Sequence, residues 1–501
     1  MCVKLLKISQ IRQIYAPKSK NLAIIFHLKF SKRFLLKRKV MDFLMIFCTL
    51  VAVGVVAYFV LKNYNPIFVF FFSGLIILIA AFYLTGTPLP NTQRKPEEIT
   101  FLTNLLDGFA FITATFKKNL AGVGLIIMSV AGFAAYMKHI NASAKLAYLA
   151  NKPLGKIKNK YLVLSGTFVV GMALKIVISS YAGLLILLLA CIYPVLLALG
   201  IRPITAASVL SLIALDYGPK DGNSINMADM VGEKDNVVGL FLDYQLYVVI
   251  AYVVVIALLI PFYYAYMDKR DKAKGINNEE VEIPEIVNPK CPTFYIFLPW
   301  LPIVFLFSAY FMGIKLDVIT ANFISIALVF IIEFIRHKDA KKLGEDMVVI
   351  LRAMAEIFVT VVAIIVAAGI FAEGIKALGG IGIIANAVSN MGASAIILTI
   401  ALLSFIVYFA TVIMGSGIAA FNAFGRLAPD IATKLGIHPM VLVLPIEIAS
   451  CLGRAASPIS GGILVLAGYT KISPIALVKR STPLLLVGMV VNILVAYCFA
   501  L

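Results

Sequence analysis

Long apolar runs recur along the chain from Asp42 onward, and each has about the length of one membrane crossing. A hydrocarbon core of ~30 Å needs ~20 apolar residues per helix. Plain spans in the first half are predicted at 43–61, 66–84 and 238–265, and a longer element at 101–137 has its membrane part at about 119–137. Residues 246–263 are apolar on every face, whereas an outer-membrane barrel would have alternating segments of ~10 residues. The pattern predicts an all-α polytopic membrane protein.

Four other apolar runs are interrupted by small and polar residues. In the first half these are 161–199, interrupted near 178–183, and 204–233, interrupted at 216–224. The second half has plain spans at 294–312, 317–335, 347–370 and 483–500, and interrupted runs at 394–433, broken at 414–417, and 440–469, broken at 453–462. The order of elements is therefore the same in both halves.

Short sequence matches at nearly one offset indicate a duplication. The pentapeptide LGIRP at 199–203 recurs as LGIHP at 435–439, a shift of 236 residues. The same shift places Ser180 on Ser416, and a shift of 237 places Gly132 on Gly369. Each match falls at the same element of its half, so we interpret the halves as repeats.

Lysine and arginine gather in the short loops of one side, with 20 there and 6 on the other. This split obeys the positive-inside rule only if 161–199 and 394–433 each enter and leave the membrane on one side. We therefore predict two inverted repeats, with about 10 full spans, two re-entrant helical hairpins and two broken helices. The repeats are 41–265 and 293–501, joined by a cytoplasmic linker at 266–292. This architecture is typical of secondary transporters.

Composition agrees with a membrane protein and locates the excess positive charge. Hydrophobic residues make up 61% of the chain and charged residues 14%, with a mean hydropathy of +0.99. Residues 1–40 hold eleven Lys and Arg and no acid, which leaves +8 of the net +19 for the remainder. This basic N-terminal extension has two interpretations: translation starts at Met41, or the extension is an arm lying on anionic lipid. Neither interpretation involves nucleic acid.

Cysteine and histidine provide no pattern of metal ligands. The six cysteines lack CxxC spacing, and the four histidines are far apart with no HExxH pair. These spacings predict neither a disulfide framework nor a zinc site. No nucleophile and base are arranged for catalysis either, so we expect a protein that is not an enzyme.

The two predicted hairpin tips combine small size with hydroxyls and free backbone amides. The first tip carries Ser179 and Ser180, and the second carries Gly415, Ser416 and Gly417. Helix N-termini hold a partial positive charge and bind carboxylates. Small residues in membrane helices also serve close helix packing. Because matched breaks occur in both halves, we favour a substrate site at the tips.

The break at 453–462 contains an arginine in an otherwise uncharged stretch. Arg454 lies where an ionised group is costly and usually functional. A guanidinium can hold a carboxylate through two parallel hydrogen bonds, so Arg454 is our candidate for the main charge partner of a substrate. Its alternative role is a salt bridge to Glu447 or another buried acid. Ser457 and Ser460 are further candidates for binding substrate or cation.

The equivalent break in the first half is more charged. Asp216 and Asp221 are candidates to take a coupling proton or ligate Na⁺, with Asn223 beside them. Lys220 either faces an anion or neutralises these acids. Lys175, just before the first tip, is either an anion ligand or a residue whose ammonium reaches the membrane interface.

Several motifs resemble the DcuC family of anaerobic C4-dicarboxylate carriers, in register from about Met41 onward. They are GFAAYM at 132–137, KPL at 152–154, SS at 179–180, GSG at 415–417, LGR at 452–454, SPISG at 457–461 and KISP at 471–474. The chain departs from the family pattern at Ile418, where Asn is usual, and at Cys451, where Asn is also usual. The break at 216–223 is also more charged than the family pattern.

The resemblance implies uptake, exchange or efflux of fumarate, malate and succinate across the inner membrane of an anaerobically growing bacterium. It also implies the fold of the ion-transporter superfamily, in which hairpin tips and helix breaks bind substrate and cation. The expected partners are dicarboxylate anions and the lipid bilayer, and we consider a homodimer as the assembly. We expect no cofactor apart from coupling to H⁺ or Na⁺.

Two alternatives from the same superfamily remain open. One is a carrier of monocarboxylates or fatty acids, and the other is a cation/proton antiporter. The acids Asp216 and Asp221 suit either alternative.

Overall fold

The computed structural model describes residues 40–275 and 288–500, apart from 57, 60–61, 63, 87, 90–91, 93, 151–158, 381–382 and 384–392. The basic segment 1–39 and the middle of the predicted linker therefore lie outside the described residues. Every regular element in the described part is helical, which confirms the all-α class.

The first half contains α-helices interrupted by short π-helical and 3₁₀ turns. Its elements are Val40–Val56, α3 (Pro66–Thr85), η1 (Pro96–Glu98), α4 (Phe101–Asn119), η2 (Leu120–Gly124), α5 (Leu125–His139), α6 (Ala142–Ala150), α7 (Lys160–Lys175), α8 (Tyr181–Cys191), α9 (Tyr193–Ala198), α10 (Pro203–Ser211), α11 (Gly222–Met230), α12 (Val237–Leu240), η4 (Phe241–Gln245) and α13 (Leu246–Ala273). Each predicted span of this half overlaps a helix.

The second half follows the same order. Its elements are η5 (Thr293–Trp300), α14 (Leu301–Phe311), α15 (Val318–His337), α16 (Ala340–Ile357), η6 (Phe358–Val362), α17 (Ala363–Ala377), α19 (Ala393–Met414), α20 (Gly417–Gly425), α21 (Ala428–Leu435), α22 (Met440–Ala455), α23 (Gly461–Thr470) and α24 (Pro474–Cys498). Across the described residues of both halves, eight helical stretches are long and apolar enough to cross a membrane.

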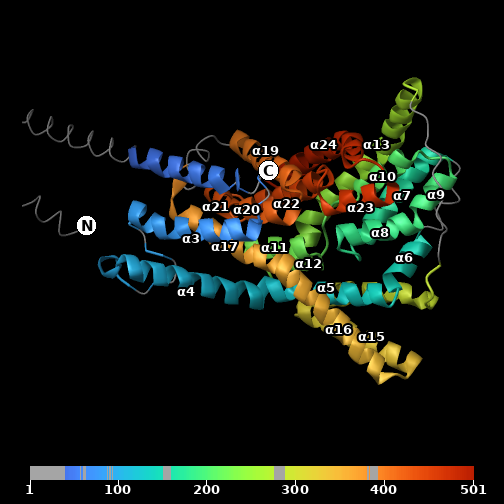
Figure 1. Ribbon diagram of the computed structural model, residues 1–501, viewed down its shortest axis with the longest axis horizontal. Coiled ribbons are helices and arrows are strands. Elements are labelled where there is room, and N and C mark those ends of the chain that lie inside the picture. Colours follow the sequence, from blue (N-terminus) through green and yellow to red (C-terminus); the bar gives the residue numbers. More distant parts are fainter. Residues whose placement is uncertain are drawn as a thin grey trace, which may run out of the picture.

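The four predicted breaks all separate helices in the structure. The chain turns between α7 and α8 at 176–180 and between α19 and α20 at 415–416. It is unwound between α10 and α11 at 212–221 and between α22 and α23 at 456–460. Figure 1 shows α7 and α8 near one end of the molecule and α20 and α21 toward the other, so the two hairpins approach the middle from opposite ends.

Helix α13 continues beyond the predicted end of its span at 265. Charged residues end the apolar pattern there, but the structure pairs them. Arg480 of α24 donates to Asp268 and Asp271, and Arg202 Nη1 lies 2.9 Å from Asp271 Oδ2. Because these buried charges are paired between helices, the helix can continue to Ala273.

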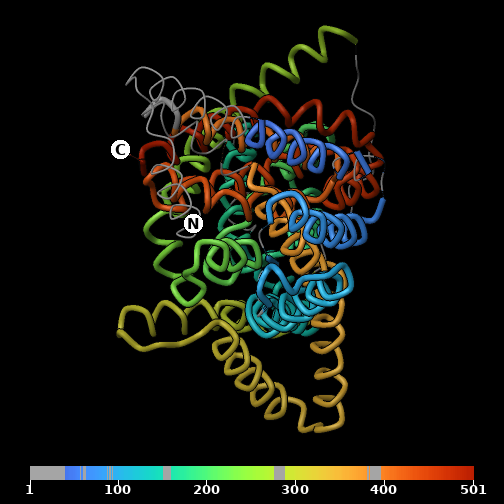
Figure 2. Tube along the Cα trace, turned by 90° about the vertical axis from the view of Figure 1, so that its left-hand side faces the viewer, coloured from blue at the N-terminus to red at the C-terminus, as the bar shows by residue number. Residues whose placement is uncertain are grey.

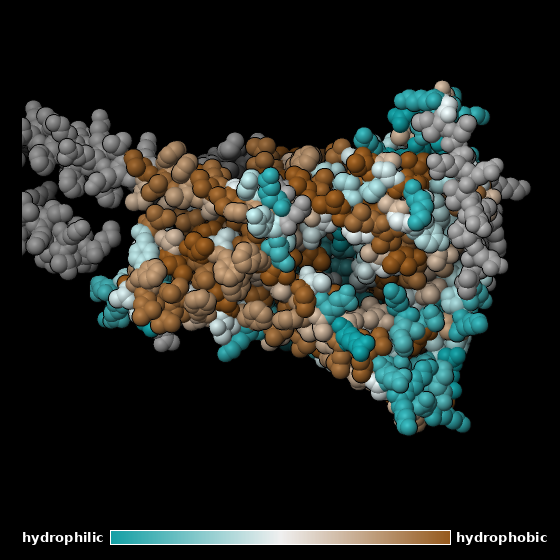
Figure 3. All heavy atoms as spheres, viewed as in Figure 1, coloured by the Kyte–Doolittle hydropathy of each residue, from teal (hydrophilic) through white to brown (hydrophobic). Residues whose placement is uncertain are grey.

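On the face that Figure 3 shows, apolar residues cover most of the surface away from one end, and hydrophilic residues gather at that end. Figure 3 shows this hydrophilic end over the turn between α15 and α16 and over the end of α13. In Figure 2, α15 and α16 extend away from the rest of the bundle. This distribution is expected of a multi-pass membrane protein whose apolar face contacts lipid.

Helices α3 and α17 are in close contact because a glycine lies between them. A Cβ atom added at Gly74 would lie 2.6 Å from the backbone nitrogen of Phe371. Such close approach through small residues is the usual way in which membrane helices pack.

We expect Gly74→Ala to destabilise the protein by about 1–3 kcal/mol, because the α17 backbone must shift. Gly468→Ala is the matched control, since a Cβ there meets nothing within 4 Å. The measurement is the thermal unfolding midpoint of the detergent-solubilised protein. Equal midpoints for the two variants would contradict the packing described here.

Candidate functional site

Each of the four breaks is followed by a helix whose N-terminus is capped by the side chain that precedes it. Ser180 Oγ accepts from Gly183 N at 3.1 Å, and Ser416 Oγ accepts from Ala419 N at 3.3 Å. Asp221 Oδ1 accepts from Asn223 N at 2.8 Å, and Ser460 Oγ accepts from Ile463 N at 3.4 Å. These caps satisfy amides that the helices leave free, which is why the chain can restart a helix at each break.

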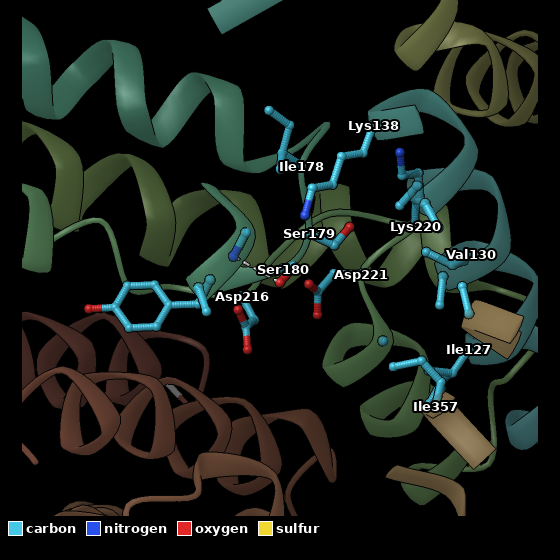
Figure 4. A pocket seen from close by; sticks show the side chains of 18 of the residues that line it. Ile127, Val130, Lys138, Ile178, Ser179, Ser180, Asp216, Lys220, Asp221 and Ile357 are labelled. Carbon is cyan, nitrogen blue, oxygen red and sulfur yellow. Dashed lines mark hydrogen bonds between the residues drawn. The ribbon is translucent and has the colours of Figure 1, made fainter. Parts of the chain in front are cut away.

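A cavity of 580 Å³ lies beside the first hairpin tip, the unwound segment 212–221 and the residues that flank the unwound segment 456–460. The predicted site residues among those that line it are Ser179, Ser180, Asp216, Asp221, Asn223 and Arg454. Figure 4 shows the first four of these grouped together, with Lys138 of α5 reaching toward them. The structure thus brings together residues from 179 to 454 in one place.

The remaining predicted residues lie outside the cavity wall. Gly415 and Gly417 instead allow the second hairpin tip to pack closely on neighbouring segments. A Cβ atom at Gly415 would lie 2.9 Å from Ile459 Cγ1, and one at Gly417 would lie 3.1 Å from Ser450 O. Ser416 and Ser460 cap helices. The second tip contributes Ile418 to the cavity wall.

Ser457, the last predicted residue, is fully buried. Its hydroxyl has no hydrogen-bond partner among the described residues.

Asp216 is the centre of the charged cluster at this cavity. Its Oδ1 lies 2.9 Å from Arg454 Nη2 and 2.8 Å from Lys175 Nζ, and its Oδ2 accepts from Asn223 Nδ2 at 2.8 Å. Arg454 therefore forms the salt bridge to a buried acid predicted as its alternative role, and the acid is Asp216 of the first half and not Glu447 of its own helix. Lys175 is 1% exposed and has buried acidic partners, which excludes an ammonium that reaches the membrane interface.

Lys220 is the other buried cation of the cavity. Its Nζ donates to Val177 O at 2.8 Å and lies 5.1 Å from the centre of the Phe133 ring. Within 4.0 Å it forms no ion pair with a described acid. Lys220 thus lines the cavity without a described acid in direct contact.

Sequence reasoning missed two side chains that shape the site. The centre of the Tyr181 ring lies 4.8 Å from the Arg454 guanidinium carbon, so the two side chains form a cation–π contact. Gln245 of η4 accepts from Gly218 N at 3.0 Å and contacts Ser224 Oγ at 3.0 Å. The only sequence signal for Gln245 was a polar residue within a long apolar run.

Glu447 and Cys451 lie one turn apart on α22, close to Asp216. Single ligand atoms of Asp216, Glu447 and Cys451 lie within 4.8 Å of one another, which is close enough to surround a cation. The Asp216 carboxylate, however, already contacts Arg454 and Lys175. Those two positive charges oppose a metal ion, so the cluster does not fit a metal centre.

Comparison with known proteins identifies relatives over nearly the whole chain. The model of the DcuC family, described as C4-dicarboxylate anaerobic carrier, matches residues 43–499. The probable anaerobic C4-dicarboxylate transporter DcuC of Vibrio cholerae is 34% identical over 450 residues, covering 89% of this chain and 95% of that protein. The anaerobic C4-dicarboxylate transporter DcuC of Escherichia coli K12 is 33% identical over 446 residues, covering 88% and 94%.

Two solved transporters share the fold at low sequence identity. The Alcanivorax borkumensis YdaH transporter aligns with a TM-score of 0.56 and 14% identity, covering 87% of this chain and 98% of its own. Neisseria gonorrhoeae MtrF, described within a class of antimetabolite efflux pumps, aligns with a TM-score of 0.54 and 16% identity, covering 87% and 95%. These likenesses concern the fold alone.

We expect Lys175→Met to destabilise the protein by about 3 kcal/mol, because Asp216 keeps one cation only and the Ser179 carbonyl loses its donor. The measurement is the SDS midpoint of unfolding in mixed micelles. Lys138→Met is the control, since this exposed lysine at the same cavity is expected to change stability by less than ~0.5 kcal/mol. A Lys175→Met variant as stable as the control would contradict a buried ion pair.

Proposed function

We propose that this chain, which belongs to the DcuC family of C4-dicarboxylate anaerobic carriers, moves C4-dicarboxylates across a membrane as a secondary active transporter. Proteins of this family are carriers, not enzymes. The proposed substrates are fumarate, malate and succinate, and the proposed location is the bacterial inner membrane. Uptake, exchange and efflux all fit this assignment.

The observation that carries the proposal is a membrane-embedded cavity in which buried cations converge. Arg454 and Lys220 line a space of 580 Å³. That volume is within the ordinary range for small-molecule sites. Lys175 lies outside the cavity wall and contacts the lining residue Asp216 at 2.8 Å. The N-terminus of α8 at Ser180 also faces the cavity, and helix N-termini favour anions.

Matching features of the two halves support the proposed inverted repeats. The long elements α4–α5 and α16–α17 each contain a π-helical turn, η2 at Leu120–Gly124 and η6 at Phe358–Val362. Each of these elements is followed by a capped hairpin and then by an unwound helix. Together these matches favour alternating access around one central site.

The position of the cavity supports an inward-facing state. Its wall includes Lys138 and Ser143, at the end of the molecule where the basic loops gather. The positive-inside rule assigns that end to the cytoplasm. The homodimer and the identity of the coupling ion, H⁺ or Na⁺, stay predictions.

One observation favours the second candidate, a carrier of monocarboxylates. Ile127, Val130 and Ile418 add apolar surface to the cavity wall. An aliphatic tail could contact that surface while one carboxylate faces Arg454. The substrate competition described next separates these two candidates.

We expect Arg454→Ala to abolish succinate transport while the protein still inserts into the membrane, because the buried anion site loses its guanidinium. The measurement is counterflow of labelled succinate in proteoliposomes, with unlabelled fumarate, butyrate or Na⁺ as challengers. Arg352→Ala is the control, since Arg352 is exposed on α16.

Fumarate alone should compete with succinate. Competition by butyrate and not by fumarate would favour the monocarboxylate carrier. Normal succinate counterflow in Arg454→Ala would contradict the role of this arginine.

A further inference from the structure

We propose that Asp216 is a tethered carboxylate that occupies the anion site of the empty carrier, and that one substrate carboxylate displaces it from Arg454 and Lys175. The displaced Asp216 then takes up one proton from the aqueous side to which the cavity is open. This inference rests on the proposed function. It adds to the proposed function that Asp216, in the unwound segment 212–221, both determines specificity and couples transport to a proton.

The contacts of Asp216 are those expected of a bound substrate carboxylate. One oxygen contacts both a guanidinium nitrogen, at 2.9 Å, and an ammonium nitrogen, at 2.8 Å, and the other oxygen accepts from an amide at 2.8 Å. Charged donors plus an amide make a complete anion site. The chain itself fills that site, so an incoming carboxylate must compete with Asp216.

Asp216 is placed where displacement is structurally feasible. It lies in the unwound segment 212–221, between the end of α10 and the start of α11, and not within a helix. It also lines the cavity, as does Arg454. A side chain on unwound backbone at a cavity wall can turn aside without breaking helical hydrogen bonds.

The loss of both cations argues for a proton. In the empty site the Asp216 carboxylate contacts Arg454 and Lys175. Once a substrate carboxylate takes over both cations, Asp216 would be left as an uncompensated charge in a buried site, which is costly. One proton makes the displaced side chain neutral. No proton is needed in the empty state, because Asp216 is then paired.

Glu447 does not take up this proton, for a geometric reason. It is fully buried, and its Oε2 has no hydrogen-bond partner among the described residues. An ionised carboxylate with one bare oxygen in such surroundings is costly, so we treat it as protonated throughout.

The groups that face Asp216 come from every element packed against it. They are Lys175 of α7, Tyr181 of α8, Asp221 of its own segment, and Glu447, Cys451 and Arg454 of α22. Lys175 and Arg454 are the cations among them. When both turn to substrate, the remaining neighbours of Asp216 are acidic or neutral, which favours its protonation.

The test compares Asp216→Asn with the unaltered protein in succinate counterflow and in net uptake driven by a pH gradient. Asn cannot compete for the two cations, so the half-saturation concentration for succinate in counterflow should fall roughly tenfold. Alkalinisation of the outside medium that accompanies net succinate uptake should be lost. Asp235→Asn is the control, since Asp235 is exposed and lies outside the cavity wall, and this variant should leave the half-saturation concentration unchanged.

A second measurement does not depend on transport. In Asp216→Ala the two cations lose their internal partner, and a small free carboxylate should fill the gap. We expect acetate to raise the thermal unfolding midpoint of purified Asp216→Ala by several degrees more than that of the unaltered protein. Chloride at equal ionic strength is the control for nonspecific salt effects.

The outcomes separate the two proposals. Absence of succinate counterflow in the unaltered protein would overturn the proposed function. Normal counterflow there, with an unchanged or higher half-saturation concentration in Asp216→Asn, would overturn the role of Asp216. Failure of acetate to stabilise Asp216→Ala would overturn it as well, whatever the substrate.

Discussion

The structure depends on how it satisfies the backbone polar groups of a helix that unwinds in an apolar environment. Between α10 and α11, at 212–221, carbonyls and amides that a helix would pair internally are free. Side chains of other elements pair with them: Tyr252 with Leu212 O at 2.9 Å, Arg454 with Ala214 O at 2.8 Å, and Gln245 with Gly218 N at 3.0 Å. Each unpaired group would cost several kcal/mol in hydrocarbon, so these contacts make the break tolerable and also fix its position.

The same requirement explains why the cavity is positively charged. At the first hairpin tip, Lys220 donates to Val177 O and Lys175 donates to Ser179 O. Lysine ammonium groups thus serve as donors to carbonyls that the turn leaves free. Once buried for this purpose, they create a positive field, and the acids of the neighbouring break balance most of it. The same lysines therefore both belong to the anion site and satisfy the free backbone carbonyls, so a substitution that changes one of these roles also changes the other.

The sequence was sufficient to predict the breaks, because each depends on a local pattern. Small and polar residues that interrupt an apolar run predict a break, and in the structure Ser180, Ser416, Asp221 and Ser460 act as helix caps at these breaks. The partners of the charged residues were not predictable, because 238 residues separate Asp216 from Arg454 and no local rule joins them. The same applies to Gln245, whose hydrogen-bond partners Gly218 and Ser224 lie in or next to the unwound segment 212–221. The continuation of α13 beyond the apolar span that ends at 265 was not predictable, because Asp268 and Asp271 are expected to be solvated unless Arg480 lies beside them.

The ion pair between Asp216 and Arg454 also joins the two halves of the molecule. Asp216 belongs to the unwound segment of the first half, and Arg454 lies on the last turn of α22, just before the unwound segment of the second. In an alternating-access carrier these two segments must keep or exchange their contacts as the site changes the side to which it opens. On the proposal that substrate displaces Asp216, this pair is present only in the empty site, where it holds the two segments together. A ligand that takes over both cations holds them together in its place, so the movement of the two halves becomes conditional on what occupies the site.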